Sequence, residues 1–242
     1  MNKIEKTTNR LSVIVVAAGT GSRMKSVERK QFIKLKERPM LAVTLELFEG
    51  HPLVSEIILV SHEEELERVR NEVLLPWNIK KVRGLVSGGT SRKDSVRAGL
   101  KAVSPGMSHI AIHDGARPLV TPELLNRVFR EAFEKGAAIL AVPVTDTIKR
   151  AGEDGVILET VPRDQLWAAQ TPQVFLAEWL LEAYEKLGEQ DLPTDDASVL
   201  EMAGYPVRLV MGHNENLKVT LPEDWNRAEI IMESRRKLNE NW

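Results

Sequence analysis

The sequence predicts an α/β fold: one twisted, mostly parallel sheet with helices on both faces and a protruding β-hairpin arm. Short apolar, β-branched runs alternate with helical patterns along most of the chain, as in repeated strand–helix units with right-handed crossovers. Glycine-rich turns follow the first and third runs, at Gly19 and Gly88. Over residues 143–165 two β-branched runs instead flank Gly152 and Gly155, which is typical of a hairpin. These observations together indicate a Rossmann-like sheet.

Each expected element has a local signal. The first strand, Leu11–Ala17, is short and almost wholly apolar, like strands buried on both faces of a parallel sheet. Pro39 can open a helix because its missing N–H costs nothing there, and Ser61 and Glu64 have capping-box spacing. Thr121-Pro122-Glu123 combines a cap, a first-turn proline and an acid at the positive end of the helix dipole. In order, the patterns predict strands at 11–17, 57–60, 82–86, 110–112, 137–142 and 207–210, and helices after 39, after 61, at 91–103, after 121, at 177–187, after 194 and after 222.

Length and composition indicate one globular domain. The chain has 242 residues, of which 43% are hydrophobic and 28% charged, enough to bury a core without metal or disulfide. We expect a single domain over 1–242, with 143–165 as an arm used for dimerisation and 1–10 as a frayed tail. The polar N-terminus lacks the apolar region of a secretory signal. The absence of cysteine excludes thiolate catalysis and Cys-ligated metals, and it fits a cytoplasmic protein.

Charge and hydropathy argue against two further classes of protein. Lys and Arg number 33 against 35 Asp and Glu, a net charge of −2, whereas a bulk nucleic-acid binder carries a basic excess. The longest stretch without these residues is Gln165–Ala177, with 13 residues, and a membrane span needs about 20. We therefore expect neither a nucleic-acid nor a membrane partner.

The turn after the first strand, Ala17–Met24, is a candidate phosphate-binding loop. Glycines let backbone N–H groups approach a phosphate closely. Both the dinucleotide fingerprint and the Walker A pattern require glycine where this chain has Met24. What is left is a glycine loop followed by the cations Arg23, Lys25, Arg29 and Lys30. The same residues also fit a tight turn with solvated charges.

Two later turns follow strands in the same way. Ser87–Ser95 contains Gly88-Gly89 and is expected to carry a helix cap. In His113–Pro118, Asp114 stands directly after a strand, where a carboxylate can hold Mg²⁺ beside phosphates. Arg117 can form a phosphate fork or a surface salt bridge, and His113 is expected to be a structural, hydrogen-bonded residue.

Three further segments have both a structural and a functional interpretation. Gln170–Gln173 is expected to be a turn, and Thr194-Asp195-Asp196 a helix cap with acids in the first turn. Asn216–Thr220 is expected to be a short strand. A half-buried Lys218 inside it suggests an anionic partner, although an edge strand would also carry a lysine.

Several of these motifs occur together and in order, and each motif alone has little specificity. The ordered set resembles the 2-C-methyl-D-erythritol 4-phosphate cytidylyltransferase family of the non-mevalonate isoprenoid pathway, from about residue 11 to the C-terminus. Small departures are Arg29 where the family usually has proline, Gly115 where it has alanine, and Ser22 where some members have arginine. The motifs are Ala17-Ala-Gly-x-Gly-x-Arg-Met24, Lys30-Gln31-Phe32, Gly88-Gly89, Asp94-Ser95-Val96, His113-Asp-x-Ala-Arg-Pro118, Asp146-Thr-Ile-Lys149, Thr171-Pro-Gln173, Thr194-Asp195 and Asn216-x-Lys-Val-Thr220.

The resemblance implies a nucleotidyltransferase that joins CTP to 2-C-methyl-D-erythritol 4-phosphate and releases pyrophosphate, in a Mg²⁺-assisted (or other divalent-cation-assisted) in-line attack. The acceptor phosphate is already a dianion near neutral pH, because its second pKa is about 6. No general base is then needed, which agrees with a sequence that shows no catalytic triad.

The resemblance also implies roles for individual residues. Arg23, Lys30, Arg163 and Lys218 would be catalytic: the first two at the CTP phosphates, the last two positioning the acceptor phosphate. CTP would be bound by Ala17, Ala18, Gly19, Gly21, Arg23, Lys30, Gly88, Gly89, Ser95, Asp114, Gly115 and Lys218. The acceptor would be bound by Asp114, Arg117, Thr147, Arg163, Thr171, Thr194 and Lys218, with Asp114 as the metal-binding carboxylate and most of the Mg²⁺ contacts made by CTP.

In the family the arm interlocks two subunits, so the resemblance implies a homodimer in which Arg117 and Thr147 reach the partner's acceptor site. Two alternatives stay open: a ribitol 5-phosphate cytidylyltransferase of the same fold, and a nucleotide-binding module without turnover. A dinucleotide-dependent oxidoreductase is disfavoured by Met24.

Overall fold

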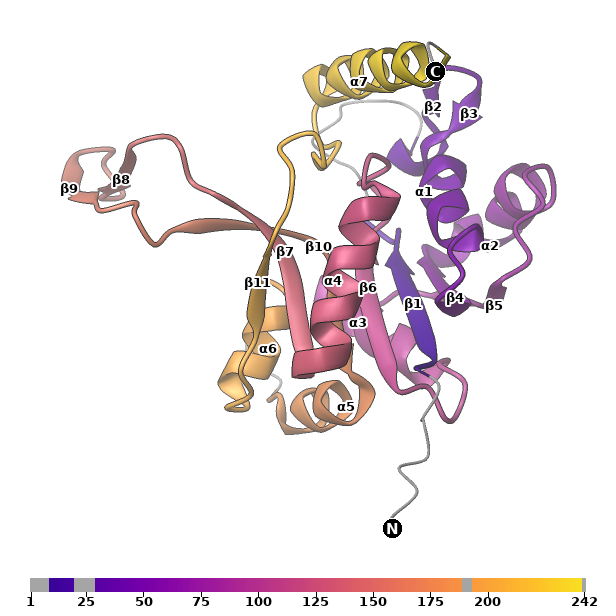
Figure 1. Ribbon diagram of the computed structural model, residues 1–242, viewed down its shortest axis with the longest axis horizontal. Helices are drawn as coiled ribbons and strands as arrows, with labels where there is room; N and C mark the ends of the chain where they lie inside the picture. Colours follow the sequence, from indigo (N-terminus) through magenta and orange to yellow (C-terminus); the bar gives the residue numbers. More distant parts are fainter. Residues whose placement is uncertain (1–8, 20–28, 189–192, 241–242) are drawn as a thin grey trace.

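The computed structural model describes residues 9–19, 29–188 and 193–240. Its centre is a seven-stranded sheet in the order β11-β7-β10-β6-β1-β4-β5, seen in Figure 1. All neighbouring strands are parallel except β10, which runs antiparallel to both β6 and β7. The expected α/β class is therefore confirmed. The strands are β1 Leu11–Val16, β4 Val54–Ser61, β5 Val82–Ser87, β6 His109–Asp114, β7 Ala137–Pro143, β10 Trp167–Leu176 and β11 Arg208–Met211.

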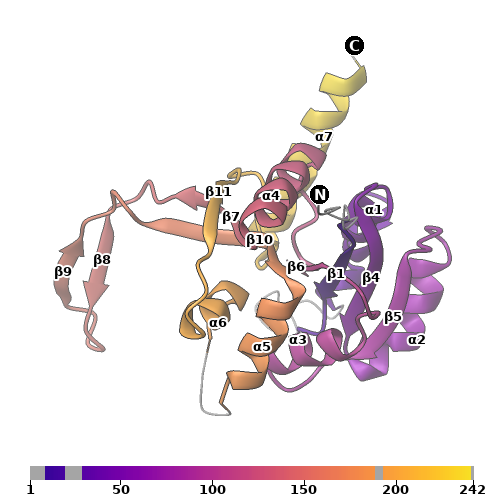
Figure 2. The ribbon, with the colours of Figure 1, turned by 60° about the horizontal axis from the view of Figure 1, so that its bottom comes forward.

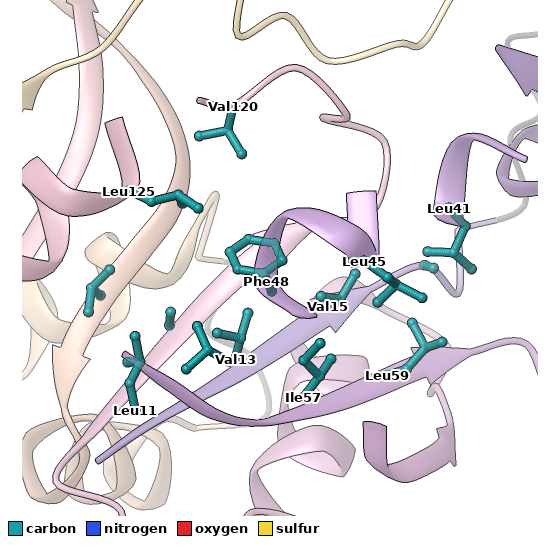
Figure 3. Close-up of a cluster of buried hydrophobic side chains, with 14 of the residues drawn as sticks. Leu11, Val13, Val15, Leu41, Leu45, Phe48, Ile57, Leu59, Val120 and Leu125 are labelled. Atoms are coloured by element: carbon teal, nitrogen blue, oxygen red, sulfur yellow. The ribbon is translucent and has the colours of Figure 1, made fainter. Parts of the chain in front are cut away.

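Helices cover both faces of this sheet because successive strand residues point to opposite sides. On β1, Leu11, Val13 and Val15 face one core cluster, whereas Ile14 belongs to the other. Figure 3 shows the first cluster, with Leu45 and Phe48 of α1 over these strands. The first face carries α1 (Met40–Glu49), α2 (Leu66–Val69) and α4 (Pro122–Lys135), and the second α3 (Arg92–Lys101), α5 (Ala177–Lys186) and α6 (Asp196–Met202).

The helix caps bear out most of the start signals. Thr121 and Ser91 accept hydrogen bonds from the backbone N–H groups of Leu124 and Asp94, and Pro39 directly precedes α1. The capping box expected at Ser61 is wrong. Ser61 is the last residue of β4, and the next helical segments are a 3₁₀ turn, η3 (Glu63–Glu65), then α2 and a π-helical turn, η4 (Arg70–Leu74).

Residues 170–173 are part of strand β10, not the expected turn. Val174 and Phe175 are fully buried, and β10 pairs with β6 and β7 on either side. Its register against β7 shifts between Ala169 and Gln173. The turn-like Thr171-Pro172 pair therefore lies in an irregularity of a central strand. Proline is tolerated at such a position because no ladder hydrogen bond is required of it.

The expected arm is confirmed as a hairpin. Strands β8 (Ile148–Ala151) and β9 (Ile157–Val161) form a separate antiparallel pair, and they lie far from the main sheet at one end of the molecule (Figures 1 and 2). Gly155 has a φ of +80° at the tip, a conformation that glycine adopts without strain.

The C-terminal helix α7 (Pro222–Glu240) packs beside the site. Its Ala228 belongs to a small core with Leu35, Met40 and Val219, and Lys36 donates its backbone N–H to Glu229 at 2.9 Å. This holds the hairpin of β2 (Lys34–Leu35) and β3 (Arg38–Pro39). Most of the expected tail, 1–10, lies outside the described residues. No described helix has the length and apolar character needed to cross a membrane.

Candidate active site

A cleft of about 470 Å³ opens at the carboxyl ends of β1, β5 and β6. This edge of an open α/β sheet is where ligands bind, because the post-strand turns converge there. Eight of the residues expected to bind nucleotide line it: Ala17, Ala18, Gly19, Gly89, Ser95, Asp114, Gly115 and Lys218. Gly21 and Arg23 lie outside the described residues. Lys30 begins a short 3₁₀ helix, η2 (Lys30–Phe32), whose next residue, Gln31, lines the cleft.

The two glycine turns meet closely, which explains the glycine pair at the second. A Cβ atom on Gly88 would lie 2.4 Å from the Cβ of Ala18, and one on Gly89 would lie 2.3 Å from the Cβ of Asp94. The Ser95 hydroxyl accepts the Gly89 N–H at 3.2 Å and donates to the Ser91 carbonyl at 2.9 Å. Ser95 therefore braces the turn as well as lining the cleft.

Asp114 is the electrostatic centre of the site. It is only 7% exposed, and its Oδ2 lies 2.8 Å from Lys218 Nζ and 3.7 Å from Arg117 Nε. Its Oδ1 lies 3.6 Å from Arg92 Nε. Burial alone would raise the pKa of Asp114, but the charges of Lys218, Arg92 and Arg117 hold the pKa well below its usual range. The carboxylate is ionised and surrounded by cations.

His113 holds this turn together and does not face the cleft. It is fully buried; its Nε2 lies 3.1 Å from the Arg117 carbonyl and its Nδ1 3.1 Å from Thr171 Oγ1. Because a carbonyl oxygen can only accept, Nε2 carries the proton of the neutral ring. Nδ1 then accepts from the Thr171 hydroxyl, whose oxygen also accepts the Asp114 N–H. His113 is a structural residue, as the sequence suggested, and both of its nitrogens are occupied.

A polar network continues from Thr171 to the segments on either side. Asn216 is fully buried, and its side-chain amide donates to Gln170 Oε1 and to the Thr171 carbonyl. Its backbone carbonyl accepts a hydrogen bond from Arg117 Nη1 at 2.7 Å. The segment 216–220 is not the expected strand: it is a loop tied to its neighbour by the Val219 N–H and the Ala116 carbonyl. Lys218 is therefore positioned by this network and not by a sheet.

Gln173 fixes the start of α6. Its amide donates to Asp195 Oδ2 at 2.8 Å and its Oε1 accepts the N–H groups of Asp196 and Ala197. The expected cap is present, with Asp195 as the capping residue: its side chain accepts the Ser198 N–H, and Asp196 is the acid of the first turn. Thr194, exposed just before this cap, lies outside the residues that line the cleft.

The arm residues lie apart from the cleft. Thr147 and Arg163 are exposed, Arg163 donates to the Thr145 carbonyl, and neither lines the cleft. Arg117 contacts Asp114 and the backbone carbonyl of Asn216 of its own chain through its guanidinium.

From the sequence, Arg92 has no expected functional role, and Asp196 is expected only as an acid in the first turn of a helix. Arg92 lines the cleft, and its Nη2 lies 2.6 Å from Oδ2 of the fully buried Asp196. The sequence did contain one signal for Arg92. A cation in the first turn of a helix lies at the positive end of the helix dipole, which is unfavourable, so an arginine there indicates a role outside the helix.

The donor set fits a magnesium ion that is held mainly by a nucleotide. Among the described residues, no group of three or more His, Asp or Glu could form a metal cage, and Asp114 is the carboxylate that lines the cleft. Mg²⁺ commonly takes one or two carboxylates together with substrate phosphates.

The fold and the cleft define a nucleotidyltransferase: a glycine-lined crevice at the end of a parallel sheet, with cations gathered on one carboxylate. The sequence profile of the 2-C-methyl-D-erythritol 4-phosphate cytidylyltransferase family matches residues 11–234, and the chain belongs to that family.

Individual relatives agree with this assignment. The chain is 44% identical to the 2-C-methyl-D-erythritol 4-phosphate cytidylyltransferase of Alkaliphilus metalliredigens, covering 94% of this chain and 95% of that protein. It is also 44% identical to the 2-C-methyl-D-erythritol 4-phosphate cytidylyltransferase of Symbiobacterium thermophilum, in a match that covers 92% of this chain and 93% of that protein. The crystal structure of 4-diphosphocytidyl-2C-methyl-D-erythritol synthase from Anaerococcus prevotii superimposes with a TM-score of 0.81 at 30% identity, covering 93% of this chain and 97% of that one. The resemblance drawn from the motifs is thus confirmed.

The buried His113 predicts an acid-sensitive stability. Burial lowers its pKa to about 4, so between pH 6.5 and 4 the unfolded chain binds a proton that the folded chain does not. The free energy of unfolding therefore falls with falling pH, and His113 contributes about 2 kcal/mol of that loss between pH 7 and 5. Urea unfolding at both values measures it. His113→Asn cannot titrate and should show a shallower loss, and an equal loss in both proteins would contradict the prediction.

Proposed function

We propose that this cleft transfers a cytidylyl group from CTP to 2-C-methyl-D-erythritol 4-phosphate. The observation that carries the proposal is the cationic cluster of Lys218, Arg117 and Arg92 around Asp114. Phosphoryl transfer depends mainly on positioning and on stabilising negative charge. A phosphate dianion attacks without a general base, which agrees with a site whose histidine has both nitrogens bonded within the protein.

The nucleotide half of the site is assigned to the two glycine turns. Backbone groups of residues 17–21 would cradle the phosphates, with Arg23 and Lys30 neutralising them. The turn at Gly88, Gly89 and Ser95 would read cytosine and ribose, and Gly115 would lie against the nucleotide. Asp114 would hold Mg²⁺, which supplies charge neutralisation at the phosphates when it is bound.

The acceptor half is assigned to Lys218 and Thr194 of this chain, together with the arm of a second copy. The buried Thr171 would act from behind the cleft, where its hydroxyl accepts the Asp114 N–H. The exposed fractions of Val156, Ile157 and Leu158 are 59%, 60% and 65%, so the hairpin exposes an apolar patch of three successive residues. An isolated two-stranded hairpin is marginally stable in water, and such patches mark interaction sites. In a dimer, Thr147 and Arg163 would act in the partner's cleft, and Arg117 in its own.

The proposed activity is tested by pyrophosphate release from the purified protein with Mg²⁺. Each of CTP, ATP, GTP and UTP is supplied with 2-C-methyl-D-erythritol 4-phosphate or with ribitol 5-phosphate. Release with CTP and methylerythritol phosphate alone is expected. Release with ribitol 5-phosphate instead would assign a different acceptor, and no release from folded protein would favour a binding module without turnover.

Lys218→Ala should lower kcat by about 10²- to 10³-fold, because it removes the cation nearest to Asp114, which the proposal places at the transferring phosphate. The same assay measures the loss, with circular dichroism to show that the fold is kept. Lys186→Ala is the matched control, since Lys186 is an exposed lysine paired with Glu182 on α5. Equal activity of the Lys218→Ala and wild-type proteins would remove Lys218 from the mechanism.

Ile157→Asp combined with Leu158→Asp should convert the dimer to monomers, because it places charge in the apolar patch of the arm. Light scattering coupled to size exclusion measures the mass, and turnover should fall with dissociation. Leu181→Asp tests the same change at an exposed leucine of α5 and should leave the dimer intact. A dimer that survives both arm substitutions would show that another surface joins the subunits.

A further inference from the structure

Arg92 lies between two carboxylates, Asp114 in the cleft and Asp196 at the start of α6. It is the first residue of α3, directly after the second glycine turn. Its Nη2 lies 2.6 Å from Asp196 Oδ2 and its Nε lies 3.6 Å from Asp114 Oδ1. One guanidinium therefore connects the nucleotide turn, the strand β6 carboxylate and the start of α6. An arginine does this well because its donors form a rigid planar fork.

Asp196 depends on this contact for its charge balance. Its side chain is fully buried, and its second oxygen accepts the Tyr184 hydroxyl at 2.7 Å. Within the described parts of the chain, Arg92 is the basic group found in ion-pair contact with it. Gln173 binds the backbone N–H of Asp196, which holds the main chain but does not neutralise the carboxylate. A buried carboxylate that loses its cation is strongly destabilised.

We propose that Arg92 is a positioning residue that sets the start of α6, and with it Thr194 on the acceptor side, against Asp114 on the nucleotide side. The inference rests on the proposed function. It assigns Arg92 to acceptor alignment and not to nucleotide binding, because the glycine turn has its own supports. The Gly88 N–H bonds to the Ser61 carbonyl at 2.8 Å and the Asp94 N–H to Ser91 Oγ at 3.1 Å.

Loss of Arg92 should therefore separate the two substrates kinetically. In Arg92→Gln we expect the KM for 2-C-methyl-D-erythritol 4-phosphate to rise about tenfold to a hundredfold and kcat to fall. The dissociation constant for CTP, measured by calorimetry without acceptor, should stay near the wild-type value. Arg92→Lys keeps the charge but not the fork, and it should restore part of the acceptor KM.

Asp196→Asn and the double variant Arg92→Gln/Asp196→Asn complete the test. If the two residues act as one bridge, the acceptor KM of the double variant is no worse than that of Arg92→Gln alone. Tyr184→Phe is the matched control: it removes the other partner of the same carboxylate and leaves the bridge. It should lower the melting temperature and leave both kinetic constants unchanged.

The outcomes separate the possible roles of Arg92. Weaker CTP binding with an unchanged acceptor KM would make Arg92 a nucleotide ligand and overturn the inference. So would a loss of melting temperature in Arg92→Gln with both constants unchanged, since that is a purely structural effect. A wild-type protein that binds CTP but releases no pyrophosphate with methylerythritol phosphate would overturn the proposed function first, and this inference with it.

Discussion

A single buried carboxylate at the end of a central strand determines how the site is built. Burying the charge of Asp114 is costly unless cations compensate it, and they come from three segments: Arg92 from the start of α3, Arg117 from the turn after β6, and Lys218 from a loop near the C-terminus. Each cation needs its own support. Arg117 is held by the Asn216 carbonyl, and His113 ties the Arg117 carbonyl to Thr171. The need to compensate the charge of Asp114 thus brings together segments that lie about a hundred residues apart in the sequence.

Much of the fold could be predicted because its strands satisfy a single physical condition. Strands buried on both faces are rich in apolar residues, and the central parts of β1, β4 and β6 are short apolar runs of this kind. Strand β10 was missed because Gln170, Thr171 and Gln173 are polar and adjoin a proline. Those side chains are buried in the polar network behind the cleft, so their burial is satisfied by hydrogen bonds that no periodicity reveals. Segment 216–220 was mistaken for a strand because a buried loop can be as apolar as one.

The candidate site was predictable where backbone geometry demands a particular residue. The close approach of Gly88 to Ala18 leaves no room for a side chain, so the glycine pattern carries information that survives without a structure. No such backbone constraint marks Arg92 or Asp196 in the sequence. They are ordinary types at a helix start, and their pairing joins positions 92 and 196, so only the fold reveals that they meet. The arm is a similar case: the sequence predicts a hairpin, but it does not reveal that the apolar residues near the tip are exposed.

The arrangement also explains how the cleft can hold cations before a substrate arrives. Three basic groups crowded into one pocket repel each other unless a negative charge lies among them. Asp114 and Asp196 supply that charge, and each is oriented by hydrogen bonds to elements behind the cleft. The basic groups are therefore fixed in place while the site is empty, and an incoming phosphate meets oriented donors that need little rearrangement. Since the attacking phosphate is already ionised, preorganised charge of this kind is the main contribution that the protein has to make.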